Sequence, residues 1–156
     1  ELQGKAQARD LSLSFPLELG GEPWTANFAN TGVPHTVLVS DDVKALDIKA
    51  LGSLVRYHER FAPAGTNANF IQVVDREHIL LRTYERGVEG ETYACGTGAA
   101  ASVAVSHALG LCGPTAKVTT SGGEILEITV RGTDIFLRGK ARLVYQGEFS
   151  PAALGL

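Results

Sequence analysis

Residues 94–110 read ACGTGAAASVAVSHALG and form the feature that most restricts the fold of this chain. Small or apolar side chains would occupy almost every side of a helix built from Cys95 to Leu109, with few charges among them. A Gly-rich turn precedes this segment, and Gly110 followed by Gly113-Pro114 ends it. A helix without a polar face is normally buried all round. The rest of the chain must therefore enclose it.

Most of the remaining sequence predicts β-strands that could form this enclosure. Leucine and phenylalanine alternate with polar or small residues in the first of them. Strands are expected at residues 11–19, 24–31, 35–40, 67–75, 78–85, 116–121, 124–130 and 134–145. A second helix is expected after the cap Asp41-Asp42. The predicted fold class is α+β, with a curved, mostly antiparallel sheet or barrel wrapped around a central buried helix.

Composition and charge exclude several classes of function. A net charge of -3 gives no electrostatic case for binding nucleic acid or an anionic membrane surface. No apolar run approaches the ~20 residues that span a bilayer. Two cysteines, without a nearby His or Cys at ligand spacing, exclude a disulfide scaffold and argue against a structural zinc site. We expect a cytoplasmic protein, since residues 1–10 are polar and lack the apolar core of a signal peptide.

Cys95 lies where the Gly-rich turn enters the helix, and this position has chemical consequences. The N–H groups of Gly96, Thr97 and Gly98 lack helical partners and should point outward, where the helix dipole favours an anion such as a carboxylate. The same field should lower the pKa of the Cys95 thiol from its reference of about 8.5. A thiolate beside a carboxylate site suits removal of the α-proton of an amino acid, because the amides stabilise the developing charge. This chemistry needs no cofactor. The alternative is that Cys95 is inert packing, since free cysteine is among the most buried residue types.

The residues around Cys95 resemble a known family. The run YERGVEGETYACGTG at residues 84–98 is similar to the second-cysteine signature of diaminopimelate epimerases, and its Glu-Arg-Gly lead-in is highly specific. Residues 31–35 (TGVPH) and 66–70 (TNANF) resemble two further segments of that family, in the same order. The resemblance covers nearly the whole chain. It implies inversion of one α-carbon of diaminopimelate, between the LL and meso forms, by two cysteines on opposite faces of that carbon.

The resemblance also assigns residue roles. It implies that Cys95 is the second catalytic cysteine, and that His35 and Glu85 tune the thiol pKa values as catalytic residues. The substrate-binding residues it implies are Asn67, Glu85, Arg86, Gly96 and Thr97, with Gly96 and Thr97 holding the α-carboxylate and Arg86 the distal one. Without the motif, Arg86 could be a surface ion pair, His35 a satisfied strand histidine and Asn67 a turn residue. Val33 departs from the family, where many members have an Asn that contacts the substrate.

The family's first half, which carries its own CGNG-type cysteine motif, has no counterpart in this sequence. Cys112 cannot replace it, because the length of the helix would put the two thiols roughly 20 Å apart. The chain also lacks methionine and begins at Glu1, so it is either processed or part of a longer protein. We therefore expect residues 1–156 to be the C-terminal catalytic half-domain, inactive alone. Its expected partners are a small dicarboxylic diamino acid and the absent N-terminal half, with a homodimer also open.

Three other functions remain open at this point. A half-domain of a proline racemase or hydroxyproline epimerase would share the architecture, but those families lack the Glu-Arg-Gly lead-in to the cysteine. A cysteine hydrolase could use Cys95, His35 and Glu85 as a triad, provided that the imidazole reaches the thiol. The chain could also be a binding or assembly module without catalytic chemistry.

Overall fold

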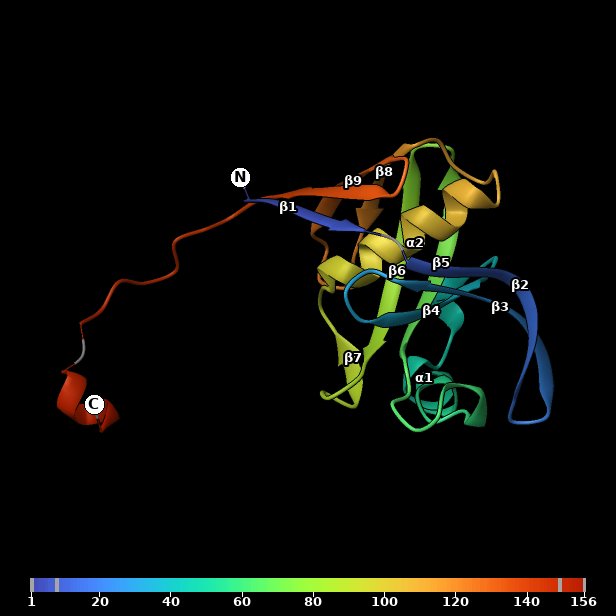
Figure 1. The fold of residues 1–156 in the computed structure, drawn as a ribbon, viewed down its shortest axis with the longest axis horizontal. Coiled ribbons are helices and arrows are strands. Elements are labelled where there is room, and N and C mark those ends of the chain that lie inside the picture. The colour runs from blue at the N-terminus through green and yellow to red at the C-terminus, as the bar shows by residue number, and fades with distance from the viewer. Residues whose placement is uncertain (1, 8, 149, 156) are drawn as a thin grey trace.

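Helix α2 (Gly96–Ala108) crosses the middle of the molecule, and strands pass it on several sides (Figure 1). The computed structural model describes residues 2–7, 9–148 and 150–155. Every residue of α2 from position 98 to position 106 is buried, as the absence of a polar face predicts. The helix contacts strands from both halves of the sheet, namely β3, β4, β5, β6, β8, β9 and β10. The expected central helix is therefore confirmed.

The strands form one mixed sheet in the order β1-β10-β9-β8-β6-β5-β4-β3-β2, with β7 pairing beside β8 on β6. Their bounds are β1 Leu2–Gln7, β2 Arg9–Leu19, β3 Glu22–Asn30, β4 Pro34–Val39, β5 Asn67–Asp75, β6 His78–Glu85, β7 Gly90–Thr92, β8 Thr115–Thr119, β9 Ile125–Arg131 and β10 Asp134–Gly139. Only the pairs β4–β5 and β6–β8 are parallel among the described strands. The α+β class and the mostly antiparallel curved sheet are thus confirmed. The sheet is not a closed barrel: its edge strands β1 and β2 are successive in the chain but lie at opposite ends of the strand order.

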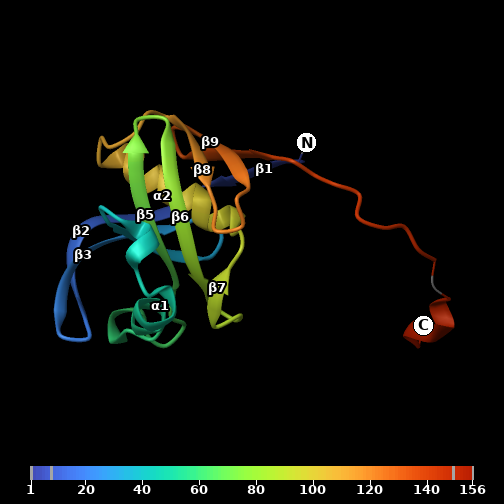
Figure 2. The ribbon, with the colours of Figure 1, turned by 180° about the vertical axis from the view of Figure 1, so that it is seen from behind.

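The central strands bury both of their faces, each against a different helix. On β4 and β5, Val37 and Ile71 pack in the cluster around α2, whereas their neighbours Leu38 and Phe70 pack in a second cluster with α1 (Ile48–Arg56). Side chains alternate between the two faces of a strand, so each strand contributes to both cores. Figure 2 shows α1 below β5 and β6 and α2 behind them. One face of these strands therefore supports the N-terminus of α2, where Cys95 lies.

Three local expectations need correction. The helix expected after Asp41-Asp42 is divided: Asp42 caps a 3-10 turn, η1 (Val43–Ala45), and Asp47 caps α1 through a 3.0 Å bond to the Ala50 amide. The last strand ends at Gly139 rather than at residue 145, and residues 140–148 run away from the sheet (Figure 1). Strands β1 and β7 were not expected, because neither has an alternating apolar pattern.

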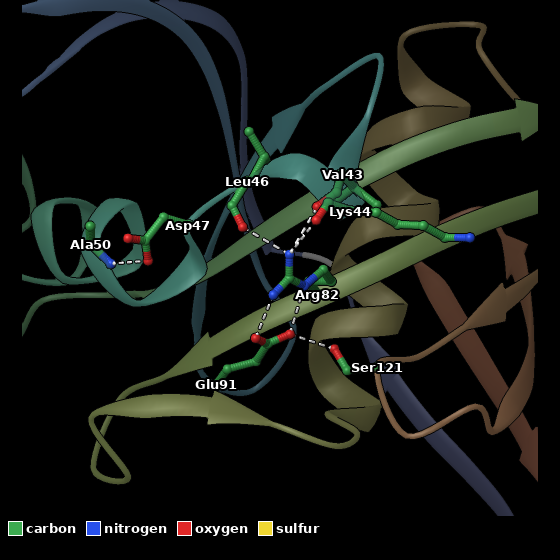
Figure 3. Close-up of polar contacts among 8 residues, drawn as sticks. All are labelled: Val43, Lys44, Leu46, Asp47, Ala50, Arg82, Glu91 and Ser121. Carbon is green, nitrogen blue, oxygen red and sulfur yellow. Dashed lines mark hydrogen bonds and ion pairs between the residues drawn. The ribbon is translucent and has the colours of Figure 1, made fainter.

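Arg82 of β6 ties the loop before α1 to strand β7 (Figure 3). Its Nη1 donates to the carbonyl oxygens of Val43, Lys44 and Leu46 at 3.1, 3.3 and 2.9 Å. Its Nε and Nη2 donate to the two carboxylate oxygens of Glu91 at 2.8 and 2.7 Å. This bidentate pair holds the pKa of the Glu91 carboxyl below its usual range. Arg82 thus fixes the segment that leads toward Cys95.

None of the helices that the structure describes is both long and apolar enough to cross a membrane.

Candidate active site

The Cys95 sulfur lies at the N-terminus of α2 and caps that helix. Cys95 has extended backbone geometry, and its Sγ accepts the Gly98 N–H at 3.4 Å. The Thr97 hydroxyl is a second neighbour, with Oγ1 at 3.6 Å from Sγ. Cys95 is 8% exposed, so the residue is largely enclosed. Two polar hydrogens can therefore be directed at one sulfur.

Burial raises the pKa of the Cys95 thiol, which corrects the expected lowering. The hydrogen bonds from Thr97 and Gly98 act in the opposite direction, as the helix-terminus argument requires, but the loss of hydration outweighs them. The negative charge of Glu85 raises the pKa further. At neutral pH the thiol form of Cys95 is therefore favoured in this chain.

His35 lies on β4 and is completely buried next to the start of α2. Its Nε2 is 3.0 Å from Thr97 Oγ1, and its Nδ1 is 3.0 Å from Asn69 Nδ2. Burial lowers the pKa of His35 to about 4, and the positive charge of Arg86 acts in the same direction. The ring is thus neutral at pH 7. Both ring nitrogens are engaged, and the connection to Cys95 runs through the Thr97 hydroxyl.

Asn67 and Arg86 are joined at the ends of β5 and β6. The Asn67 side chain accepts the Arg86 backbone N–H at 2.8 Å and donates to the Pro34 carbonyl at 2.9 Å. The Arg86 guanidinium donates through Nη1 to the Ala64 carbonyl at 3.2 Å, and the residue is half-buried. The structure therefore brings these two predicted substrate contacts together. Asn67 is an interstrand link rather than a turn residue.

Glu85 is the last residue of β6 and is half-buried. Its backbone carbonyl accepts the N–H groups of Val88 and Glu89, which closes the turn after the strand. Its carboxylate lies near enough to Cys95 to raise the pKa of that thiol. Both residues predicted to tune a thiol therefore lie near Cys95: the charge of Glu85 reaches the sulfur, and His35 contacts the Thr97 hydroxyl beside it.

The amides expected to hold a carboxylate differ in how they are used. Gly98 donates its N–H to the Cys95 sulfur, so this amide is already hydrogen-bonded and does not face a substrate carboxylate. Gly96 is half-buried and Thr97 exposed, which leaves these two residues at the surface beside the sulfur. The Thr97 backbone is anchored by its carbonyl, which accepts the Thr31 hydroxyl at 3.0 Å. Gly96 and Thr97 therefore keep exposed surface beside Cys95, and the Thr97 N–H also faces the sulfur, where it acts to lower the pKa of the thiol.

Cys112 lies beyond the opposite end of α2, is 1% exposed and packs in the core around that helix. Both cysteines are free thiols. Cys112 is therefore separated from Cys95 by the helix, as expected, and takes no part in the site.

A pocket of about 560 Å³ is lined by residues of β6, β7 and β8, among them Arg82 and Glu91. Figure 3 shows the ion pair between these two residues. The pocket lining includes Lys44, Tyr93 and Ser121, but none of the residues predicted to bind substrate or to transfer protons. Among residues 2–7, 9–148 and 150–155, no group of three or more His, Cys, Asp or Glu side chains could hold a metal ion. The pocket and the Cys95 surface are therefore separate features.

Sequence reasoning assigned no role to Asn69, which the structure places at the centre of the polar network. Asn69 and Asn67 are two residues apart on β5 and share the strand face of Ile71, which packs against α2. Asparagine is depleted in strands, so two on one face of a buried strand were a usable signal. Thr31, which anchors Thr97, lies just after β3 in a loop and gave no such signal.

Comparisons of the sequence with known proteins identify one family. The family model described as diaminopimelate epimerase matches residues 27–144, more than half of the chain. A diaminopimelate epimerase of Hydrogenobaculum sp. is 45% identical over 127 residues, which are 80% of this chain and 46% of that protein. The diaminopimelate epimerase of Aquifex aeolicus is 44% identical over 141 residues, 88% of this chain and 50% of that protein. The chain thus spans about half the length of the curated relatives it matches.

A solved structure supports the fold independently. A probable proline racemase from Agrobacterium radiobacter K84, with bound carbonate, superposes with a TM-score of 0.59. The match covers 96% of this chain and 54% of that one, at 18% sequence identity. At this identity the likeness establishes the shared architecture alone.

Proposed function

The chain belongs to the diaminopimelate epimerase family, and from this premise we propose that it supplies one half of an active site that inverts the α-carbon of diaminopimelate. The observation that carries the proposal is the position of the Cys95 sulfur. It caps α2, next to the Gly96 and Thr97 amides, with polar hydrogens of Gly98 and Thr97 within reach. A sulfur so placed can exchange a proton with a carbon whose carboxylate is bound at the same helix terminus.

In the proposed reaction, Gly96 and Thr97 donate their backbone N–H groups to the α-carboxylate. When the α-proton leaves, charge moves onto that carboxylate, and each fixed donor stabilises it by about 3 kcal/mol if it resembles an oxyanion-hole amide. The Cys95 thiol donates a proton to one face of the α-carbon. In the reverse direction the Cys95 thiolate, stabilised by Thr97 and Gly98, removes it. A second cysteine on the opposite face, from the family's first half, takes the α-proton as a thiolate in the forward direction and returns one as a thiol in the reverse direction.

The other predicted contacts would select the substrate. The free donors of the Arg86 guanidinium suit the distal carboxylate, because a planar fork pairs with a carboxylate at two points. The Glu85 carboxylate would pair with the α-ammonium group. The Asn67 side chain would hold Arg86 in position by accepting its backbone N–H. Within this scheme protons move between carbon and sulfur, and no cofactor is needed.

A cysteine hydrolase fits the geometry less well. Such an enzyme needs an imidazole nitrogen that can take the thiol proton. His35 has both ring nitrogens engaged, and Thr97 stands between its Nε2 and the sulfur. Burial also keeps the pKa of His35 at about 4, which makes it a weak base.

The proposal can be tested by complementing the chain. We expect the 156-residue chain alone to leave LL-diaminopimelate unchanged. Joined to the first half of the Aquifex aeolicus relative, it should produce the meso form, with deuterium at the α-carbon when the reaction runs in D₂O. Proline serves as the competing substrate. Turnover of proline but not diaminopimelate would contradict the proposal, and so would turnover by the chain alone.

A further inference from the structure

Asn69 has both polar ends of its side chain engaged at a fully buried position. Its Nδ2 lies 3.0 Å from His35 Nδ1 and 3.1 Å from the Thr36 carbonyl oxygen. Its Oδ1 accepts the Thr83 hydroxyl at 3.1 Å. Buried polar groups are costly unless they are hydrogen-bonded, so this amide is held in one orientation.

The Thr36 carbonyl determines which end of the Asn69 side-chain amide faces His35. A carbonyl oxygen can only accept, so the Asn69 group that faces it must be the NH₂. The same nitrogen has a second hydrogen, which is directed at Nδ1 of His35. Nδ1 must therefore accept. In a neutral imidazole, an accepting Nδ1 leaves the proton on Nε2.

This tautomer has a consequence at the sulfur. The Nε2–H of His35 donates to Thr97 Oγ1 at 3.0 Å. The hydroxyl has one hydrogen, which is then free for the Cys95 sulfur at 3.6 Å. The opposite tautomer would reverse this sequence, because an unprotonated Nε2 would take the Thr97 hydrogen and the sulfur would lose a donor.

We propose that Asn69 is a positioning residue that keeps the His35 proton on Nε2 and thereby turns the Thr97 hydroxyl toward the Cys95 sulfur. The catalytic meaning of this assignment rests on the proposed function. The hydrogen-bond order itself does not, and it can be measured on the 156-residue chain. Gly98 belongs to the same arrangement, since a Cβ at that position would meet Asn69 Oδ1.

The direct test is the tautomer of His35 by two-bond ¹H–¹⁵N correlation NMR at pH 7. The wild-type chain should show a protonated Nε2 and an unprotonated Nδ1. In Asn69→Asp the carboxylate can only accept, so Nδ1 should gain a proton. The matched control is Asn27→Asp, which changes another buried strand asparagine, one that bonds Ser14 and Val37 and not His35. A protonated Nδ1 in the wild type, an unchanged Nδ1 in Asn69→Asp, or the same change in Asn27→Asp would overturn the proposal.

A second test asks whether Asn69 acts on Cys95 through Thr97. In a Cys112→Ala background, Asn69→Leu should slow alkylation of Cys95 by iodoacetamide on the order of threefold or more, the coupling expected within one network. In Thr97→Val, where no hydroxyl remains to be turned, the same substitution should have almost no effect. If Asn69→Leu slowed the alkylation of Cys95 by the same factor with and without the Thr97 hydroxyl, the proposed route through Thr97 would be contradicted. If Asn69→Leu does not fold, the tautomer of His35 measured in the wild-type chain still tests the proposal. Failure of epimerisation with the His35 tautomer intact would count against the proposed function alone.

Discussion

His35 Nε2 lies 3.0 Å from the Thr97 hydroxyl oxygen, and that oxygen lies 3.6 Å from the Cys95 sulfur. The buried histidine and the cysteine therefore communicate through a residue of the helix that the cysteine caps. The family resemblance named all three residues, but it gave Thr97 a role through its backbone amide alone. The structure adds the side chain to that role.

Thr97→Val tests the hydroxyl directly. Valine keeps the shape and removes the donor whose hydrogen bond lowers the pKa of the Cys95 thiol, so that pKa should rise further. The pH dependence of iodoacetamide alkylation in a Cys112→Ala background measures this shift. Thr129→Val, at a half-buried position on β9 far from Cys95 in the sheet, is the control. An unchanged alkylation profile in Thr97→Val would show that the hydroxyl does not act on the sulfur.

His35 should make stability depend on pH in a defined window. Its folded-state pKa is about 4, against 6.5 for an exposed histidine, so the unfolded chain binds more protons between these values. Stability should therefore fall as the pH drops from 6.5 toward 4, by about 3 kcal/mol for this residue. Above pH 6.5 the contribution is constant.

Urea unfolding at pH 7 and pH 4.5 checks this prediction. The loss of stability between the two pH values should be smaller in His35→Gln than in the wild type, because other titrating groups cancel in the comparison. His78→Gln, on β6 away from Cys95, is the matched control and should keep the wild-type loss. Equal losses in wild type and His35→Gln would mean that folding does not lower the pKa of His35.

Gly98→Ala should destabilise the chain, although alanine is ordinarily the better helix former by about 1 kcal/mol. A Cβ at this position would meet Asn69 Oδ1 and would lie 3.2 Å from the Cys95 sulfur. We expect a loss of roughly 1–3 kcal/mol, typical of overpacking. Gly96→Ala is the comparison, since its Cβ would meet only the end of the Leu137 side chain, which can move. Thermal unfolding of both variants tests the difference, and a Gly98→Ala chain as stable as the wild type would contradict the packing described.

Arg82→Met should weaken the attachment of the loop before α1. Three backbone carbonyls lose their shared donor, and Glu91 loses its charged partner and keeps only the Ser121 hydroxyl, which together should cost about 1–3 kcal/mol in the free energy of unfolding. Glu127→Gln is the control, because its exposed ion pair with Arg138 is 3.7 Å long and worth little. Chemical denaturation compares the two, and an Arg82→Met loss no larger than that of Glu127→Gln would contradict the role of Arg82.

The parts of the fold that the sequence predicts are those in which local pattern and tertiary contact agree. The lack of a polar face on α2 and the apolar alternation within residues 11–19 of β2 led to the correct placement of both elements, because burial determines both patterns. Strands β1 and β7 were missed because neither has an alternating apolar pattern: β1 is held by pairing with the distant β10, and β7 is a three-residue strand paired with the end of β6. The same limit applied at the site. The motif identified Cys95, whereas the raised pKa of its thiol depends on burial by the surrounding fold, which a local argument from the helix terminus does not contain.

The central claim is that Cys95 exchanges a proton with the α-carbon of diaminopimelate. The most direct measurement compares Cys95→Ala with Cys112→Ala in the chain joined to the first half of the Aquifex aeolicus relative, following conversion of LL- to meso-diaminopimelate in D₂O. Cys95→Ala should lower kcat/KM by at least about a hundredfold, the range for loss of a general acid or base. Cys112→Ala should retain activity. Undiminished turnover and α-deuteration by the Cys95→Ala protein would contradict the account.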